Sequence, residues 1–194
     1  MAKNNRQGKA KIWDERAIKK MRSLLPAGHH RLIFEIGLYT GERIGAIVQL
    51  KVSDVYSQDG KVLETINFGG STRKSSKHGL AKTRQIFIHD DLKLHLEHYD
   101  RPDSGYLFPS WANFGHITTR AVDKMWRSIF WQAGLVGYST HSSRHWIINK
   151  MRSNGIDTST IADAMGIDVA TVRNYLRYDE IRTRNAIASI KVAA

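Results

Sequence analysis

The sequence predicts a mainly helical protein with a small antiparallel β-sheet, an α+β fold, and three observations support this prediction. Apolar residues recur at helical spacing through most of the 194 residues. Between residues 60 and 88 the pattern changes to two short runs, KVLETINF and KTRQIFIH, separated by a turn rich in Gly, Ser and Lys, which is typical of a β-hairpin. Hydrophobic residues make up 41% of the chain, enough for an ordinary core. We therefore expect one main domain with a small sheet near its first third.

The helical segments are recognised by their apolar spacing and by the residues that begin and end them. The first follows a flexible basic arm at residues 1–11, with Asp14 placed to cap it and Pro26 to end it. Residues 31–50 are mostly apolar but are interrupted by the sequence TGER, which predicts two buried helices meeting at that turn. Thr118 is placed to cap a later helix that Gly134 closes. The remaining helices are expected at residues 90–99, 141–154, 158–165 and 169–178.

Charge is the most informative property of the composition. Thirty Lys and Arg residues against eighteen Asp and Glu residues give a net charge of +12. Such an excess favours a polyanionic partner, because neutralised phosphates release condensed counterions. We therefore expect a protein that binds nucleic acid. No apolar run reaches the ~18 residues that span a membrane and the N-terminus lacks the apolar core of a secretion signal, so we expect the protein to be intracellular.

The residues best suited to chemistry on a phosphate lie in the C-terminal third. In THSSRHW, His141 and Arg144 stand three positions apart, so on a helix they share one face and can converge on one phosphate. His145, next to them, is interpreted as a locally packing residue. Further along, VATVRNYLRY carries Tyr175 and Tyr178. A phenol is a poor nucleophile at its usual pKa of about 10, but clustered cations offset the charge that develops on attack.

Arg43, in the sequence LYTGERIGAIVQL, is a second candidate ligand for a phosphate. A guanidinium makes planar, bidentate contact with two phosphate oxygens. The turn TGER by itself is more often a plain helix junction. Its place before the β-hairpin and far upstream of Arg144 gives it more weight.

Together, TGER, the lysine-rich hairpin, HSSRHW and VATVRNY resemble the tyrosine recombinase (phage integrase) family over residues 12–180. The resemblance implies a recombinase catalytic domain that cleaves and rejoins DNA through a covalent 3′-phosphotyrosine. Arg43, His141 and Arg144 would hold the scissile phosphate and Tyr175 would attack it, with Tyr178 in reserve. A hairpin lysine would protonate the leaving 5′ oxygen. The candidates for this general acid are Lys74, Lys77 and Lys82, of which Lys77 fits the family's lysine-glycine turn best.

The resemblance also implies partners and a location. We expect double-stranded DNA as the partner, with Lys74, Lys82, Arg84 and Arg173 as DNA-binding residues, and no metal and no cofactor. We expect a homo-tetramer on paired DNA sites, no membrane association, and a cytoplasmic protein that is associated with the nucleoid, or with the host cell if it is phage-encoded. The tail at residues 181–194 would pack on a neighbouring subunit. No room remains before Trp13 for the family's usual N-terminal DNA-clamping domain, so the chain is either a fragment or a short recombinase.

Two positions depart from the family's usual pattern. Ile167 stands where a histidine or tryptophan is usual, and it has no side-chain donor for a phosphate. Ala46 stands three residues after Arg43, where an acidic residue is common. These departures predict slow cleavage or substitution by a neighbouring residue.

Two other functions fit parts of the sequence. TSTIADAMGIDVATVRNYL also has the pattern of a helix-turn-helix, with Thr171 and Arg173 exposed on a recognition helix, which predicts a non-catalytic DNA-binding regulator. That interpretation leaves Arg43, the lysine hairpin and HSSRH unexplained. A type IB topoisomerase-like enzyme that relaxes DNA would share the tyrosine chemistry.

Overall fold

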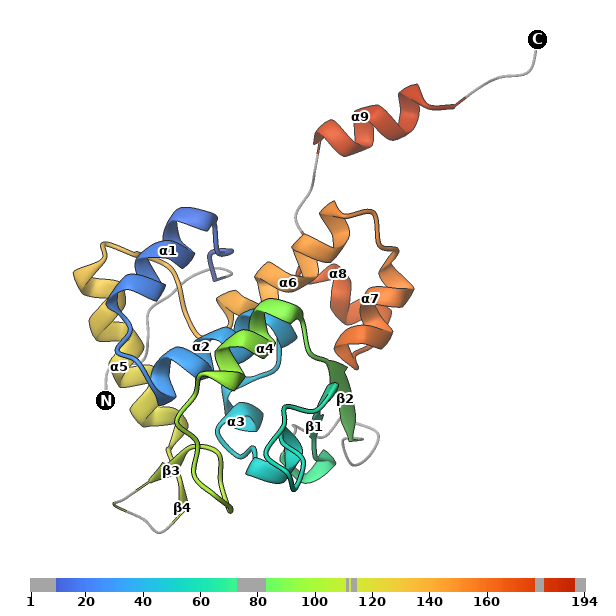
Figure 1. The fold of residues 1–194 in the computed structure, drawn as a ribbon. Helices are drawn as coiled ribbons and strands as arrows, with labels where there is room; N and C mark the ends of the chain where they lie inside the picture. The colour runs from blue at the N-terminus through green and yellow to red at the C-terminus, as the bar shows by residue number, and fades with distance from the viewer. Residues whose placement is uncertain (1–9, 73–82, 111, 113–114, 177–179, 191–194) are drawn as a thin grey trace.

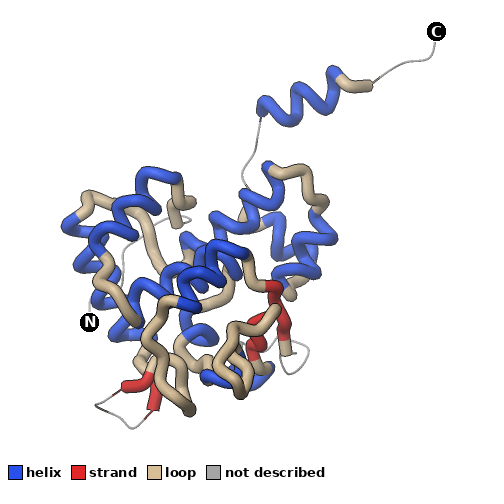
Figure 2. The backbone as a smooth tube through the Cα atoms, in the orientation of Figure 1, coloured by secondary structure: helices blue, strands red, loops and turns tan. Residues whose placement is uncertain are grey.

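The computed structural model describes residues 10–72, 83–110, 112, 115–176 and 180–190. Helices form most of this part of the chain, and two short antiparallel hairpins lie at one end of it (Figures 1 and 2). In chain order the elements are α1 (Glu15–Leu24), α2 (His29–Thr40), α3 (Ile44–Ile47), η1 (Val52–Asp54), β1 (Thr65–Phe68), η2 (Gly70–Thr72), β2 (Arg84–Phe87), α4 (Asp90–Glu97), β3 (Pro109–Ser110), β4 (Gly115–His116), α5 (Thr119–Gln132), α6 (Ser142–Ser153), α7 (Thr158–Met165), α8 (Val169–Arg173) and α9 (Glu180–Ala188). The predicted α+β class is confirmed.

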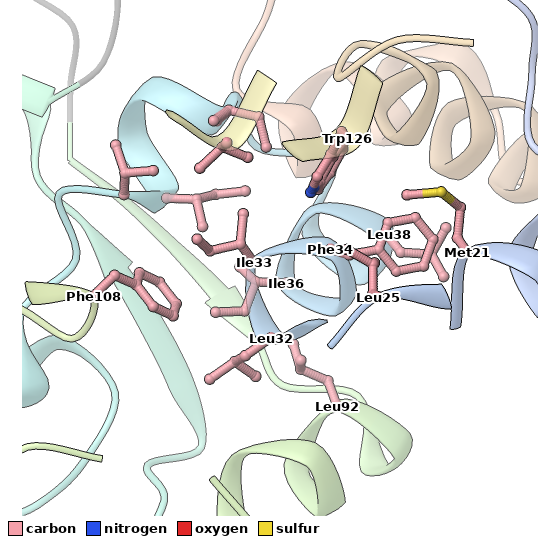
Figure 3. Packing of buried hydrophobic residues seen from close by; sticks show 14 of the residues in the cluster. Met21, Leu25, Leu32, Ile33, Phe34, Ile36, Leu38, Leu92, Phe108 and Trp126 are labelled. Atoms are coloured by element: carbon pink, nitrogen blue, oxygen red, sulfur yellow. The ribbon is translucent and has the colours of Figure 1, made fainter. Parts of the chain in front are cut away.

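Helix α2 is the centre of the core. It is buried along most of its length and packs against α3, α4 and α6, while α1 packs against α5. Figure 3 shows Phe34 of α2 beside Trp126 of α5; their ring centroids are 5.7 Å apart in an edge-to-face arrangement. A fully buried side chain of this kind contributes about 1.5–3 kcal/mol, so this contact holds α5 firmly to the centre of the fold.

Local capping chemistry places two of the helix starts as predicted. Asp14 accepts a hydrogen bond from the Ala17 amide at 2.8 Å, and Thr118 accepts one from the Ala121 amide at 3.1 Å. Each cap satisfies an amide that has no partner within its helix, an effect of typically about 1 kcal/mol. The helix starts follow from short-range sequence signals alone.

The predicted β-hairpin is present and is short. Strand β1 pairs antiparallel with β2, from Thr65 opposite Phe87 to Phe68 opposite Arg84, and Ile66 and Phe68 point into the core with no exposed surface. The turn at residues 73–82, which carries the three candidate lysines, lies outside the described residues. A second hairpin, in which β3 pairs with β4, lies in and just after a segment that the sequence predicts as loop.

The C-terminal helices have a small apolar core of their own. Tyr175, Leu176 and Ile167 pack against this core. It is formed by five buried residues from α6, α7 and α8: Ile148, Ile161, Ala162, Met165 and Val172. In Figure 1, α9 stands apart from these helices, at the red end of the chain, and it carries the exposed Ile187. The small core therefore fixes the segment around Tyr175 against α6.

Candidate active site

The turn between α2 and α3 places Arg43. Gly41 ends α2 in the left-handed conformation, with φ of 62°. A side chain at this position would begin 2.5 Å from atoms of both Ile147 and Met165, so both the backbone angle and the space require glycine. The Arg43 amide then donates to Oε1 of Glu42 at 3.0 Å, which fixes the turn as it enters α3.

Arg43 and His141 line the same open cavity, which measures about 370 Å³. Arg43 is half-buried at the N-terminal end of α3, and His141 is exposed at the N-terminal end of α6. Other residues that line the cavity include Gln49, Thr72, Thr119 and Thr140. A cationic guanidinium, an imidazole and several hydroxyl groups therefore surround a space that is open to solvent.

The pKa of His141 lies below its usual value. Although part of its side chain is exposed, surrounding protein withdraws the ring from bulk water, and the positive charges of Arg43 and Arg144 disfavour a third cation beside them. The imidazole is therefore biased toward its neutral form, in which one nitrogen donates a hydrogen bond and the other accepts one.

Arg144 lies one helical turn after His141 on α6 and is 2% exposed. Its Nη1 donates to the Gly41 carbonyl at 3.0 Å, and its Nη2 donates to the Met165 carbonyl at 3.4 Å. Its Nη1 also lies 3.8 Å from Oε1 of Glu42. A buried guanidinium requires such partners because desolvation of an unpaired charge is costly. These contacts aim Arg144 at the junction of α2, α6 and α7.

Tyr175 lies beside Arg144 and is half-buried. The Cζ atom of Arg144 is 5.8 Å from the centroid of the Tyr175 ring, and the His145 ring centroid is 4.8 Å from it. Asn149 Nδ2 donates to the Tyr175 carbonyl at 3.0 Å. Side chains of α6 therefore hold both the ring and the backbone of Tyr175.

Four of the five predicted catalytic residues are thus linked through neighbouring contacts: Arg43, His141, Arg144 and Tyr175. Arg144 is the link, because its charge helps to lower the pKa of His141 and its guanidinium lies beside the Tyr175 ring. Lys77, the predicted general acid, lies outside the described residues, as do Lys74, Lys82 and the reserve nucleophile Tyr178.

Arg84 requires a correction among the predicted DNA-binding residues. Its side chain is 7% exposed and forms an ion pair of 2.9 Å with Glu42. Because the guanidinium faces the interior, this position does not favour a direct DNA contact. Arg173, by contrast, is exposed at the end of α8, where a DNA contact stays a prediction. Thr171, which was expected to be exposed, is half-buried.

Sequence reasoning missed Glu42 and Asn149. Glu42 is 3% exposed and supplies a carboxylate beside Arg43, close to where Ala46 lacks one. A buried arginine such as Arg144 needs an anionic partner, but the sequence does not reveal that Arg144 is buried. Nothing local in the sequence indicates Asn149, whose contacts depend on how α6 packs against the end of α8.

Neither a cluster of metal-ligating side chains nor a membrane-spanning helix is found among the described residues. Within the described residues, no group of three or more His, Asp or Glu side chains could hold a metal ion. Over the same ranges, no helix is long and apolar enough to cross a membrane.

Comparison with known families decides the relationship that these residues suggest. The model of the phage integrase family matches residues 15–182. The chain belongs to the phage integrase family. No curated protein matches this family member in sequence.

Solved structures of recombinases are similar to this integrase family member in fold. The XerA recombinase is 23% identical with a TM-score of 0.71, and the similarity covers 94% of this chain and 66% of that one. The XerH recombinase bound to its difH substrate, a post-cleavage complex, is 21% identical with a TM-score of 0.69 over 97% of this chain and 55% of that one. The Tn1549 transposon integrase is 13% identical with a TM-score of 0.70 over 95% and 67%. The chain thus has the fold of these proteins and spans about half to two thirds of their length.

Proposed function

We propose that this protein is a site-specific recombinase that cleaves and rejoins double-stranded DNA through a covalent 3′-phosphotyrosine. The observation that carries the proposal is the grouping of four side chains: Arg43 and His141 line one cavity, and Arg144, whose charge lowers the pKa of His141, lies beside the Tyr175 ring. A helix-turn-helix regulator would need no such arrangement around its second helix.

The cavity that Arg43 and His141 share is where the scissile phosphate binds. Arg43 contributes a half-exposed guanidinium, which can contact two non-bridging oxygens at once. Arg144 is already held by the carbonyls of Gly41 and Met165, so it adds positive charge from a fixed position. Preorganised charge of this kind stabilises the pentacoordinate transition state without reorganisation during the reaction.

The chemical step exchanges one phosphodiester for another. The Tyr175 hydroxyl oxygen attacks phosphorus, and the bond from phosphorus to the 5′ oxygen breaks. His141, biased toward its neutral form, accepts the phenolic proton, and a hairpin lysine, for which Lys77 is the favoured candidate, donates a proton to the leaving 5′ oxygen. Attack by a 5′-hydroxyl from another strand reverses the step, so neither metal nor ATP is needed.

The partners follow from the same proposal. Two of the similar proteins, XerH and the Tn1549 integrase, were solved in complex with DNA, and the +12 net charge of this chain suits the same ligand. We propose a homo-tetramer on paired sites, acting in the cytoplasm at the nucleoid. The exposed Ile187 and Ile190 in the C-terminal segment would pack on a neighbouring subunit.

The test is capture of the covalent intermediate. A pool of duplexes of randomised sequence, nicked so that the cleaved strand end diffuses away and rejoining is blocked, is incubated with the protein in EDTA. We expect a protein–DNA adduct that survives denaturation, is lost in Tyr175→Phe and persists in Tyr178→Phe. Sequencing the captured DNA would then define the site.

Other results would overturn the proposal in distinguishable ways. Salt-sensitive DNA binding with no adduct from any duplex would favour the non-catalytic regulator. Loss of the adduct in Tyr178→Phe alone would move the nucleophile. Adducts without sequence preference, together with relaxation of supercoiled plasmid, would favour the topoisomerase-like alternative.

A further inference from the structure

Arg84 joins three segments that are distant in sequence. It is the first residue of β2 and comes directly after the turn that carries the candidate lysines. Its Nη1 donates to Oε2 of Glu42 at 2.9 Å, and its Nη2 donates to the carbonyls of Thr40, at 3.3 Å, and Ala164. The same Nη2 lies 3.8 Å from the sulfur of Met165. One guanidinium therefore binds the hairpin to the α2–α3 turn and to the end of α7.

The Glu42 carboxylate lies between two arginines, Arg84 and Arg144. Its Oε2 faces Arg84, while its Oε1 accepts from the Arg43 amide at 3.0 Å and lies 3.8 Å from Nη1 of Arg144. The Glu42 side chain is 1% exposed, so its charge must be balanced by these neighbours. If Arg84 were absent, Oε2 of Glu42 would lose this ion partner, and the attraction of Glu42 would act more strongly on Arg144 and draw it away from a DNA phosphate.

The end of α7 is held from two sides. Arg84 bonds to the Ala164 carbonyl and Arg144 to the Met165 carbonyl. At Gly166 the chain takes the left-handed conformation that ends α7, and it then enters α8, which leads to Tyr175. A shift of this helix end would therefore move the tyrosine segment and Arg144 together.

We infer that Arg84 is a positioning residue that couples strand β2 to Arg144 and to the Tyr175 segment through Glu42, and that it does not contact DNA. This inference rests on the proposed function, whose reaction it would serve. The guanidinium matters by geometry as well as charge, because only a planar fork reaches Glu42, Thr40 and Ala164 at once. Arg84→Lys would keep the ion pair and lose the remaining contacts.

The first experiment separates positioning from DNA binding. Single-turnover adduct formation at saturating nicked DNA and the Kd at several salt concentrations are measured for Arg84→Met, with Arg127→Met as the matched control. Arg127 forms an exposed ion pair with Asp123 on α5. We expect Arg84→Met to slow adduct formation about tenfold or more, since small misplacements are costly in rate, with Kd within about twofold and an unchanged salt slope. Arg84→Lys should be intermediate, and Arg127→Met should cleave at the rate of the unsubstituted protein.

A direct phosphate contact predicts the opposite pattern. Kd would weaken, the slope of log Kd against log salt would fall by about one, and the rate at saturation would be retained. That result would overturn the inference and leave the proposed function standing.

A double variant tests the role of Glu42. Arg84→Met leaves a buried carboxylate with one partner fewer, and Glu42→Gln removes that charge while keeping the shape. We expect Arg84→Met/Glu42→Gln to form adducts faster than Arg84→Met alone, a non-additive result that only a coupled pair gives. Additive losses would show that Glu42 does not mediate the effect.

Hydrogen exchange tests the coupling without requiring cleavage. In Arg84→Met, amides at residues 41–43 and 164–176 should exchange faster than in the unsubstituted protein, in addition to those of β2. Faster exchange confined to β2 would overturn the coupling, whether or not adducts form. Absence of adducts from the unsubstituted protein, with the expected exchange pattern, would instead refute the proposed function alone.

Discussion

Replacing Gly41 with alanine should destabilise the protein strongly and disturb the candidate site at the same time. At φ of 62° a residue with a Cβ costs about 1–2 kcal/mol. The new methyl would also begin 2.5 Å from Cγ2 of Ile147 and from Cε of Met165. The methionine end can move away, but the branched isoleucine cannot move without shifting α6, so overpacking adds about 1–3 kcal/mol. We expect a loss of about 2–5 kcal/mol, a large part of the stability of an ordinary domain.

Gly134 provides the matched control for this substitution. Its φ is 65°, and a Cβ there would meet no atom within 4 Å. Gly134→Ala should therefore cost only the backbone strain, about 1–2 kcal/mol. Urea unfolding followed by circular dichroism gives both free energies under the same conditions.

The difference between the two variants isolates the packing around Gly41. If Gly41→Ala costs no more than Gly134→Ala, the close approach of Ile147 and Met165 does not constrain the turn, and the reasoning is refuted. Because the Gly41 carbonyl accepts from Arg144, adduct formation should also fall in Gly41→Ala and stay normal in Gly134→Ala.

Two further predictions concern charge. The pKa of His141 is lower in the folded protein than its usual value near 6.5, so as the pH falls the unfolded chain takes up the proton first. The free energy of unfolding should therefore decrease as the pH drops below about 6.5, and it should decrease less steeply in His141→Gln. Urea midpoints measured from pH 7.5 to 5 check this. An equal slope in both proteins would contradict this. Arg22→Met should cost about 2–4 kcal/mol, because it removes the arginine partner of the fully buried Glu35 and leaves only His95 nearby, at 3.7 Å. Lys61→Met removes an exposed pair and should cost under about 1 kcal/mol. Equal thermal shifts would refute the distinction.

The parts of the fold that sequence could predict are those set by short-range chemistry. Asp14 and Thr118 cap helices because their oxygens reach amides within one turn, and that signal is local. The β1–β2 hairpin follows from alternation over several residues. The pair β3–β4 has two residues in each strand, too few to show any period, so it was not predictable in this way.

The candidate site divides in the same manner. Arg43, His141, Arg144 and Tyr175 were recognisable because each belongs to a short motif. The family resemblance implied a DNA contact for Arg84, and only its contacts with Glu42 and with the end of α7 show that its guanidinium faces inward. Burial of a charged side chain depends on contacts between remote segments, which composition and spacing do not reveal.

The bonds that hold Arg144 have a consequence for how this sequence can change over time. Two of its acceptors, at Gly41 and Met165, are main-chain carbonyls, and every amino acid supplies one. The aim of the guanidinium therefore depends on the path of the backbone, and only loosely on which side chain occupies position 165. Apart from Gly41, where both the backbone angle and the space require glycine, substitutions around this junction can accumulate as long as α2 and α7 end at the same residues. An insertion or deletion of a single residue there would displace a carbonyl that holds Arg144 and would abolish the activity of the site, even with every motif intact.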